Sequence, residues 1–214
     1  MIVSVEAKGA PRRTAAERAG DDPATRARKP RADGQRNRER LMQAAKAGFA
    51  EVGAKVSLDE IARRAGVGIG TLYRHFPTRD AIVEAVYRRE VQQLANSATR
   101  LLESLSPGEA LHQWMRLFVD YIATKKVIAS ALSSIVGGAS ALYAFSGAQI
   151  TDAMSLLVER ASASGDIRAD VDPADLLRAV VGFTYGNASP EWQASALRLI
   201  EILMDGLRPA RGAG

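Results

Sequence analysis

The chain has 214 residues, enough for a sizeable core, and its 47% hydrophobic and 25% charged residues are ordinary for a globular protein. The absence of cysteine excludes disulfides and thiolate metal sites, and no apolar run approaches the roughly 18 residues of a membrane span. The first residues, MIVSVEAKGAPRR, lack the basic and then apolar regions of a secretory signal, so we expect a cytoplasmic protein without a membrane partner.

The net charge of +5 is concentrated at the N-terminus. Residues 1–40 contain 11 Lys and Arg against 6 Asp and Glu, which leaves the rest of the chain neutral. Residues 1–33 are rich in Ala, Arg, Pro, Gly and Asp, and they contain too few large apolar side chains to order themselves. We therefore predict a disordered basic arm, which is either a solvated tail or an aid to binding an anionic partner.

Helical signals follow the arm. Apolar residues between 41 and 52 recur with a 3.6-residue period, which predicts a first helix ending near Gly53. In VSLDEIARRAG, Ser57 and Glu60 have the spacing of a capping box, and Gly66 supplies a stop for this short second helix. A third short helix is predicted at residues 69–75.

The remainder of the chain is also predicted to be helical. Starts are marked by Ser106-Pro107-Gly108-Glu109, by Asp172-Pro173 and by Ser189-Pro190, each with a capping residue before a proline at the first helical position. No sustained period-2 alternation occurs, so the fold is predicted to be all-α. The other predicted helices cover residues 79–104, 107–122, 127–135 and 147–163, followed by the two helices that open at Pro173 and Pro190.

The segment AGVGIGTLYRHFPTRD places Gly66, Gly68 and Gly70 at alternate positions in front of the third helix. A dinucleotide-binding loop would need its third glycine at the position of Thr71 and a strand before it, and both are missing. A short capped helix, a glycine turn and a second short helix are instead typical of a helix-turn-helix. Gly68 and Gly70 would then let the backbone of the second helix approach DNA closely.

The apolar residues of this segment can form a small core, which leaves four side chains of the third helix facing outward: Thr71, Tyr73, Arg74 and His75. Arg74 is the best candidate for reading a base, because its planar fork matches guanine O6 and N7. The alternative for Tyr73 is core packing with a satisfied hydroxyl, and that for His75 is an ordinary surface histidine. Ser57 and Arg79 begin adjacent helices and suit phosphates.

The sequence LMQAAKAGFAEVGAKVSLDEIARRAGVGIGTLYRHFPTRDAIVEAV closely resembles the DNA-binding domain of TetR/AcrR-type bacterial transcriptional regulators. The resemblance implies a three-helix domain at residues 34–86, joined by a long helix to a helical effector-binding and dimerisation domain at 87–209, with a tail at 210–214. It places Ser57 and Arg79 at phosphate-contacting positions and these residues on the recognition helix: Gly68, Ile69, Gly70, Thr71, Tyr73, Arg74 and His75. Members often carry Ser-Lys or Ser-Arg where this chain has Gly68-Ile69, so the base preference does not transfer.

The segments WMRLFVDYIATKK and IRADVDPADLLRAVVG are similar to one C-terminal subtype of these regulators. Aromatic, methionine and leucine residues gather on the middle helices, either as core or as the lining of an effector pocket. The candidates for this pocket are Trp114, Met115, Phe118, Tyr121, Ile122, Phe145, Met154, Leu157, Phe183 and Tyr185.

The last two predicted helices carry broad apolar stripes. These stripes either pack within the chain or pair with a second copy as a four-helix bundle. The candidates for a dimer interface are Leu176, Val180, Trp192, Ala196, Leu199, Leu203 and Leu207.

Three classes of function remain to be compared. A dimeric transcriptional repressor that binds a palindromic DNA operator and is released by an effector fits the helix-turn-helix and the large neutral body. An enzyme would need more than His75 and His112, and no catalytic triad or carboxylate-rich metal cluster is present, so we expect no enzyme, cofactor or metal. A nonspecific DNA-compacting protein would explain the basic arm alone.

Overall fold

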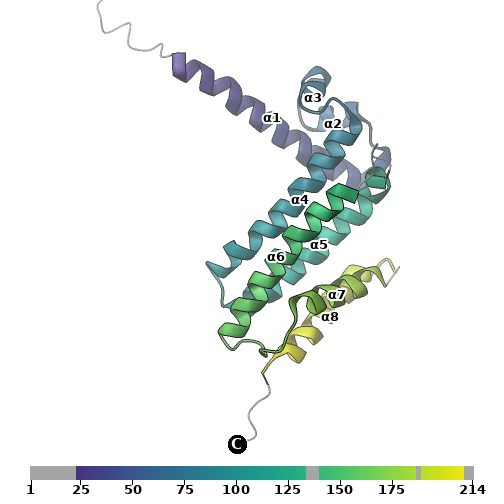
Figure 1. Ribbon diagram of the computed structural model, residues 1–214. Helices are drawn as coiled ribbons and strands as arrows, with labels where there is room; N and C mark the ends of the chain where they lie inside the picture. Colours follow the sequence, from purple (N-terminus) through teal and green to yellow (C-terminus); the bar gives the residue numbers. More distant parts are fainter. Residues whose placement is uncertain (1–22, 134–139, 187–188, 210–214) are drawn as a thin grey trace, which may run out of the picture.

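The computed structural model describes residues 23–133, 140–186 and 189–209, and within these residues the chain is helical without a strand. The predicted all-α class is thus confirmed. Figure 1 shows a head, made of α1 to α3, and a body, made of the remaining helices, with α4 running from one into the other. The elements are α1 (Pro23–Val52), the short 3-10 helix η2 (Gly53–Lys55), α2 (Leu58–Arg64), α3 (Ile69–His75), α4 (Arg79–Leu102), α5 (Pro107–Ser133), α6 (Ser140–Ala163), α7 (Pro173–Tyr185) and α8 (Trp192–Leu207).

The long first helix corrects one prediction. α1 begins at Pro23, so residues 23–33 are helical and do not belong to a disordered arm. Residues 1–22 and the predicted tail at 210–214 lie outside the described residues. Polar pairs three residues apart lie in the middle turns of α1, before Leu41: Arg36 binds Asp33, and Arg40 Nη2 donates to Asn37 Oδ1 at 2.5 Å. Residues 23–40 contain no large apolar side chain and so give no apolar periodicity, which is why the start of the helix was predicted too late.

The head has the small core that the apolar pattern predicts. Leu41, Ala45 and Phe49 on α1 are fully buried, and Ile82 and Val83 at the start of α4 are buried in the same cluster. From the two short helices, Ile61, Leu72 and Phe76 complete this core with at most 1% exposure each. Because three elements converge on α1, the positions of α2 and α3 are fixed by packing rather than by their own short length.

The body is built on α4, which packs along α5 and α6. α5 continues through residues 123–126, where a break into two helices was predicted. That segment contains neither Gly nor Pro, and Ile122, Ile128 and Leu132 keep one buried face across it, so nothing ends the helix there. Likewise, α6 begins at Ser140 rather than near Gly147, which lies inside the helix with open space around it.

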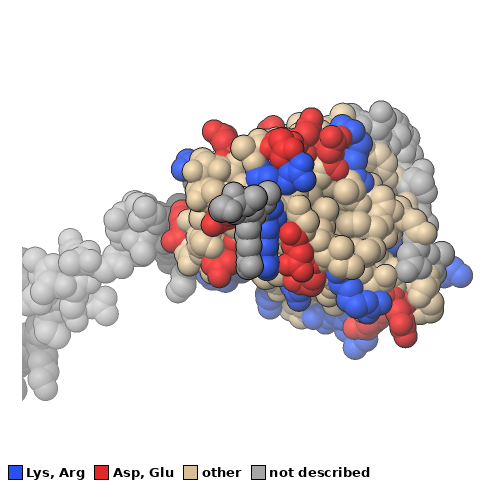
Figure 2. Space-filling view, turned by 90° about the horizontal axis from the view of Figure 1, so that it is seen from below, with Lys and Arg blue, Asp and Glu red and all other residues tan. Residues whose placement is uncertain are grey.

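α7 and α8 form a layer beside α5 and α6, visible at the lower right of Figure 1. Asp172 caps α7 as predicted, because its Oδ1 accepts from the backbone N–H of Ala174 at 2.7 Å. The second predicted cap is displaced: Ser189 Oγ accepts from the N–H of Glu191 at 3.1 Å, but the helix begins only at Trp192. Seen from below in Figure 2, basic and acidic side chains are interspersed over this end of the molecule.

Among the residues that the structure describes, no helix combines the length and apolar character needed to cross a bilayer.

Candidate nucleic-acid interface and a tyrosine-lined cavity

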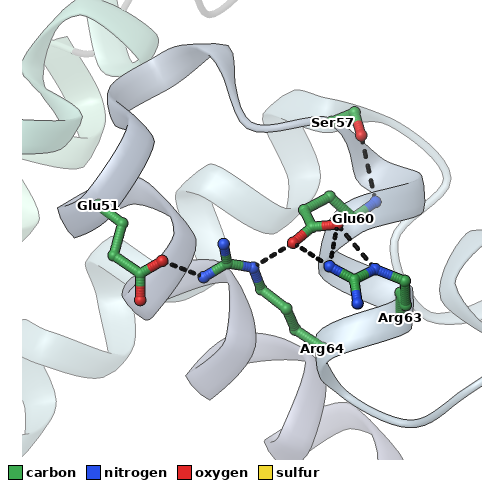
Figure 3. Close-up of polar contacts among 5 residues, drawn as sticks. All are labelled: Glu51, Ser57, Glu60, Arg63 and Arg64. Carbon is green, nitrogen blue, oxygen red and sulfur yellow. Dashed lines mark hydrogen bonds and ion pairs between the residues drawn. The ribbon is translucent and has the colours of Figure 1, made fainter.

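The start of α2 is fixed by polar contacts within the head (Figure 3). Ser57 Oγ accepts from the N–H of Glu60 at 3.1 Å, which is half of the predicted capping box. The other half is missing, because the Glu60 carboxylate binds Arg63 at 2.7 Å and Arg64 at 2.6 Å instead. Hydrogen bonds from Arg63 and then Arg64 hold the pKa of Glu60 below its ordinary value. Arg64 also reaches Glu51 of α1 at 2.6 Å, so the network ties α2 to α1.

The turn after α2 is a Schellman motif built on Gly66. The N–H of Gly66 donates to the Arg63 carbonyl and that of Val67 to the Ala62 carbonyl, both at 3.1 Å. Gly66 has a φ of +64°, a left-handed conformation that costs a residue with a side chain considerably more. The predicted stop at Gly66 is confirmed, and residues 65–68 alone separate α2 from α3, which is the turn length of a helix-turn-helix.

The inner face of α3 anchors the helix and its outer face is left to solvent. Leu72 is fully buried, and Phe76, which follows the helix, is 1% exposed. On the other side Ile69 is 36% and Tyr73 48% exposed, so Tyr73 lies on the surface and not in the core. Arg74 is also exposed. This arrangement is that of a recognition helix, held by two apolar contacts and presenting its N-terminal half outward.

The N-terminal turn of α3 has no side chain at two of its positions, Gly68 and Gly70. A Cβ atom added to Gly68 or Gly70 would meet nothing within 4 Å. Arg74 lies back along this turn, with its Nη2 donating to Thr71 Oγ1 at 3.0 Å and its Nε to the Gly70 carbonyl at 3.3 Å. Since these contacts are exposed and local, the guanidinium can leave them for a base edge at small cost.

Two of the predicted DNA contacts are more deeply tied to the head than expected. His75 is half-buried beside α1, with its Cε1 atom 3.9 Å from the place that a Cβ on Gly34 would occupy. Arg79 donates through Nη1 to the Val56 carbonyl at 2.5 Å, and its guanidinium lies 5.9 Å from the centre of the Phe49 ring. Arg79 therefore helps to hold the head together, whereas His75 lies against α1, and the contact of either residue with DNA stays a prediction.

The predicted pocket residues are divided by the structure between core and cavity. Trp114 belongs to the core, because its Nε1 donates to the Leu94 carbonyl at 2.9 Å and its ring stacks on Phe118 at 5.7 Å. Phe183 packs against the core without lining the cavity, and the side chain of Phe145 lies outside the described residues. The predicted residues with no exposed surface, all in the core, are Trp114, Met115, Met154 and Leu157.

A cavity of about 180 Å³ lies between α4, α5, α6 and α7. The predicted residues that line it are Phe118, Tyr121, Ile122 and Tyr185. Tyr87 and Tyr143 line it as well and were missed. The tyrosines come from four different helices, and no spacing in the sequence connects them.

The predicted interface residues of α7 and α8 are divided in the same way. Trp192 and Leu203 are partly buried against the core, whereas Leu199 is 37% exposed. Ile202, which was not predicted, is 67% exposed and lies one turn from Leu199 on α8. The side chains buried within this chain, which leave no surface for a second copy, are Leu176, Val180, Ala196 and Leu207.

Within the residues that the structure describes, no group of three or more His, Asp or Glu side chains is placed to hold a metal ion.

A recognition helix on a helical head, joined to a helical body with a cavity, defines a DNA-binding transcription regulator of the helix-turn-helix class. Residues 41–86 match the model of bacterial regulatory proteins of the tetR family, and residues 106–209 match the C-terminal domain of SbtR-like transcriptional regulators.

Solved structures extend this similarity to most of the chain. A TetR transcriptional regulator from Streptomyces coelicolor is 43% identical with a TM-score of 0.74, over 81% of this chain and 99% of that one. A TetR transcription regulatory protein from Mycobacterium vanbaalenii is 37% identical with a TM-score of 0.71, over 84% and 99%. The chain therefore belongs to the TetR family of bacterial transcriptional regulators, which are transcription factors and not enzymes.

Curated relatives match a shorter region. A helix-turn-helix-type transcriptional regulator from Staphylococcus aureus is 28% identical over 103 residues, which are 48% of this chain and 54% of that protein. The chain thus spans about half the length of the curated relatives it matches.

Proposed function

We propose that the protein is a cytoplasmic repressor that binds a palindromic operator as a homodimer and is released when a small molecule enters the cavity. The observation that carries this proposal is the outer face of α3, where Gly70, Tyr73 and Arg74 are exposed on a helix fixed from behind by Leu72. Such a helix places a few side chains at the base edges of one major groove.

The proposed two-fold dimer is inferred from the exposed face of α8. Leu199 and Ile202 are large apolar side chains exposed on one face of this helix, and such a patch favours association with a second copy. A C2 dimer presents two recognition helices related by a two-fold axis, which matches a palindromic site. Arginines of the basic segment at residues 1–33 would add phosphate contacts beside each head.

Release by an effector follows from the position of α4. Its first turns carry Ile82 and Val83 in the core of the head, and Tyr87 lies at the cavity. A molecule that displaces Tyr87 acts on the helix that also supports the head, so it shifts the separation of the two recognition helices.

The test is a competition binding experiment. An operator selected from randomised duplexes is compared with a scrambled duplex by fluorescence anisotropy at fixed salt. The Arg74→Ala variant is expected to lose about 1–3 kcal/mol of binding free energy on the operator and little on the scrambled duplex, because a base contact carries discrimination. Arg160→Ala, which removes an exposed arginine from α6, is the matched control and should bind both duplexes normally.

Two outcomes would contradict the proposal. Equal affinity of the unmodified protein for operator and scrambled duplex would indicate nonspecific DNA compaction. Equal losses of Arg74→Ala on both duplexes would make this residue a phosphate contact and remove it from base recognition.

A further inference from the structure

The cavity between α4 and α7 has a closed floor and an exposed rim. Tyr87 and Tyr121 form the floor, with 1% and 5% exposure, whereas Tyr143 and Tyr185 are 38% and 49% exposed at the rim. The ring of Tyr143 meets that of Tyr87 edge-on, with their centres 5.9 Å apart. An occupant therefore enters past two aromatic side chains and meets flat aromatic walls on its way to the floor.

The floor supplies a hydrogen-bond donor. The Tyr121 hydroxyl donates to that of Tyr87 at 3.2 Å, a bond that uses one of the two hydroxyl protons of the pair. The other proton remains for an acceptor on an occupant. Burial raises the pKa of Tyr121 far above its ordinary value, and the bond to Tyr87 raises it further, so Tyr121 keeps the proton that it donates to Tyr87.

The charge that faces the cavity is positive. Among the described residues that line it, Lys125 is the one with a charged side chain, and its Nζ lies 4.9 Å from the centre of the Tyr143 ring at the rim. The neighbouring Lys126 lies behind the rim and does not line the cavity, although its Nζ is 5.1 Å from the centre of the Tyr185 ring. This Nζ donates to the Thr184 carbonyl at 2.6 Å and lies 3.6 Å from the centre of a Trp192 ring. The lining contains no carboxylate among these residues, so a cationic occupant would have no counter-charge.

The size of the cavity limits the occupant to a small molecule. A cavity of about 150 Å³ binds benzene in a well-studied engineered case. The present cavity of about 180 Å³ therefore has room for one ring with a small substituent. We propose that the effector is a single-ring aromatic carboxylate, with its ring between the tyrosines and its negative charge at Lys125. This inference rests on the proposed function only in calling the occupant an effector.

The experiment uses three planar molecules of nearly the same shape and different charge: benzoate, benzamide and benzamidine. Isothermal titration calorimetry on the full chain is expected to give tighter binding of benzoate than of benzamide by about tenfold or more, with benzamidine the weakest. Lys125→Met keeps the aliphatic stem and removes the charge, so benzoate should fall to the affinity of benzamide. Lys55→Met removes an exposed lysine next to the head and should leave all three affinities unchanged.

The outcomes separate the ligand from the function. Absence of binding by all three probes at millimolar concentration would overturn the proposed ligand class, as would an affinity of benzamidine equal to or above that of benzoate. Retention of the benzoate preference in Lys125→Met would overturn the role of that lysine. Operator binding is measured on the same preparations without any probe. A failure of the proposed function would therefore appear in the operator measurement and would leave the calorimetric result for the ligand class unaffected.

Discussion

Replacing Gly70 by alanine is expected to change folding and DNA binding in opposite directions. Gly70 is the second residue of α3, and a Cβ placed on it would meet nothing within 4 Å. Alanine therefore fits without strain and stabilises the helix by about 0.5–1 kcal/mol, because glycine has more backbone freedom to lose on folding. For a protein of this size, that gain corresponds to a rise in Tm of about 1–4 °C.

On the operator, the same methyl group lies on the surface of α3 that is proposed to face the base edges. A recognition helix in the major groove leaves little free space at its N-terminal turn. An added methyl group must then displace the helix, and we expect operator affinity to fall by at least about tenfold, or about 1.4 kcal/mol. Stability and affinity thus move in opposite directions for one added carbon.

The measurements are thermal melts and fluorescence anisotropy on the same preparations, without effector. Gly182→Ala is the matched control, because a Cβ on Gly182 would also meet nothing within 4 Å inside a helix, but on α7 in the body and outside the cavity lining. It should be stabilised by a similar amount and bind the operator normally. A Gly70→Ala variant that melts higher and keeps full operator affinity would refute a close approach of this turn to DNA.

Two further predictions address the dimer and the α2 network. Ile202→Glu places a charge at a position that is 67% exposed in the single chain, so the variant should sediment as a monomer while its far-UV circular dichroism stays unchanged. A variant that remains dimeric would show that the interface does not include this face of α8. Since Arg63 and Arg64 lower the folded-state pKa of Glu60 below 4.5, the stability that Glu60 contributes is present above about pH 4.5 and is lost as the pH falls through the lower folded value. Between about pH 7 and pH 3, the Tm of Glu60→Gln should therefore fall by less than the Tm of the unmodified chain. An equal fall in Tm for the two proteins would contradict a stabilising role of the Glu60 carboxylate.

The short helices α2 and α3 of the head could be predicted closely from the sequence because their signals are local. Ser57 caps α2, Gly66 supplies the left-handed turn, and the bounds of α3 agree with those predicted. Each of these signals acts over three or four residues, which is the range over which sequence patterns determine backbone conformation. The first turns of α1 are the exception, because residues 23–40 contain no large apolar side chain that would give a helical period.

The cavity could not be predicted, because it depends on how four distant helices pack. Trp114 and Phe118 lie on one stripe of α5, and periodicity alone assigns them the same environment. Packing buries the first completely and leaves the second at the cavity wall. The same limit applies to α8, where Ala196 and Leu199 are both apolar but only Leu199 is exposed.

The position of Tyr87 has a consequence for redesigning this protein as a biosensor. Tyr87 lies eight residues after the first residue of α4, or about 12 Å along a rigid helix that enters the head. Tyr143 and Tyr185 belong to α6 and α7, whose packing partners are other helices of the body, whereas Lys125 lies on α5, which also packs on α1. Libraries restricted to Tyr143 and Tyr185 should therefore change which compound is detected, whereas changes at Tyr87 should alter the strength of the response to every compound.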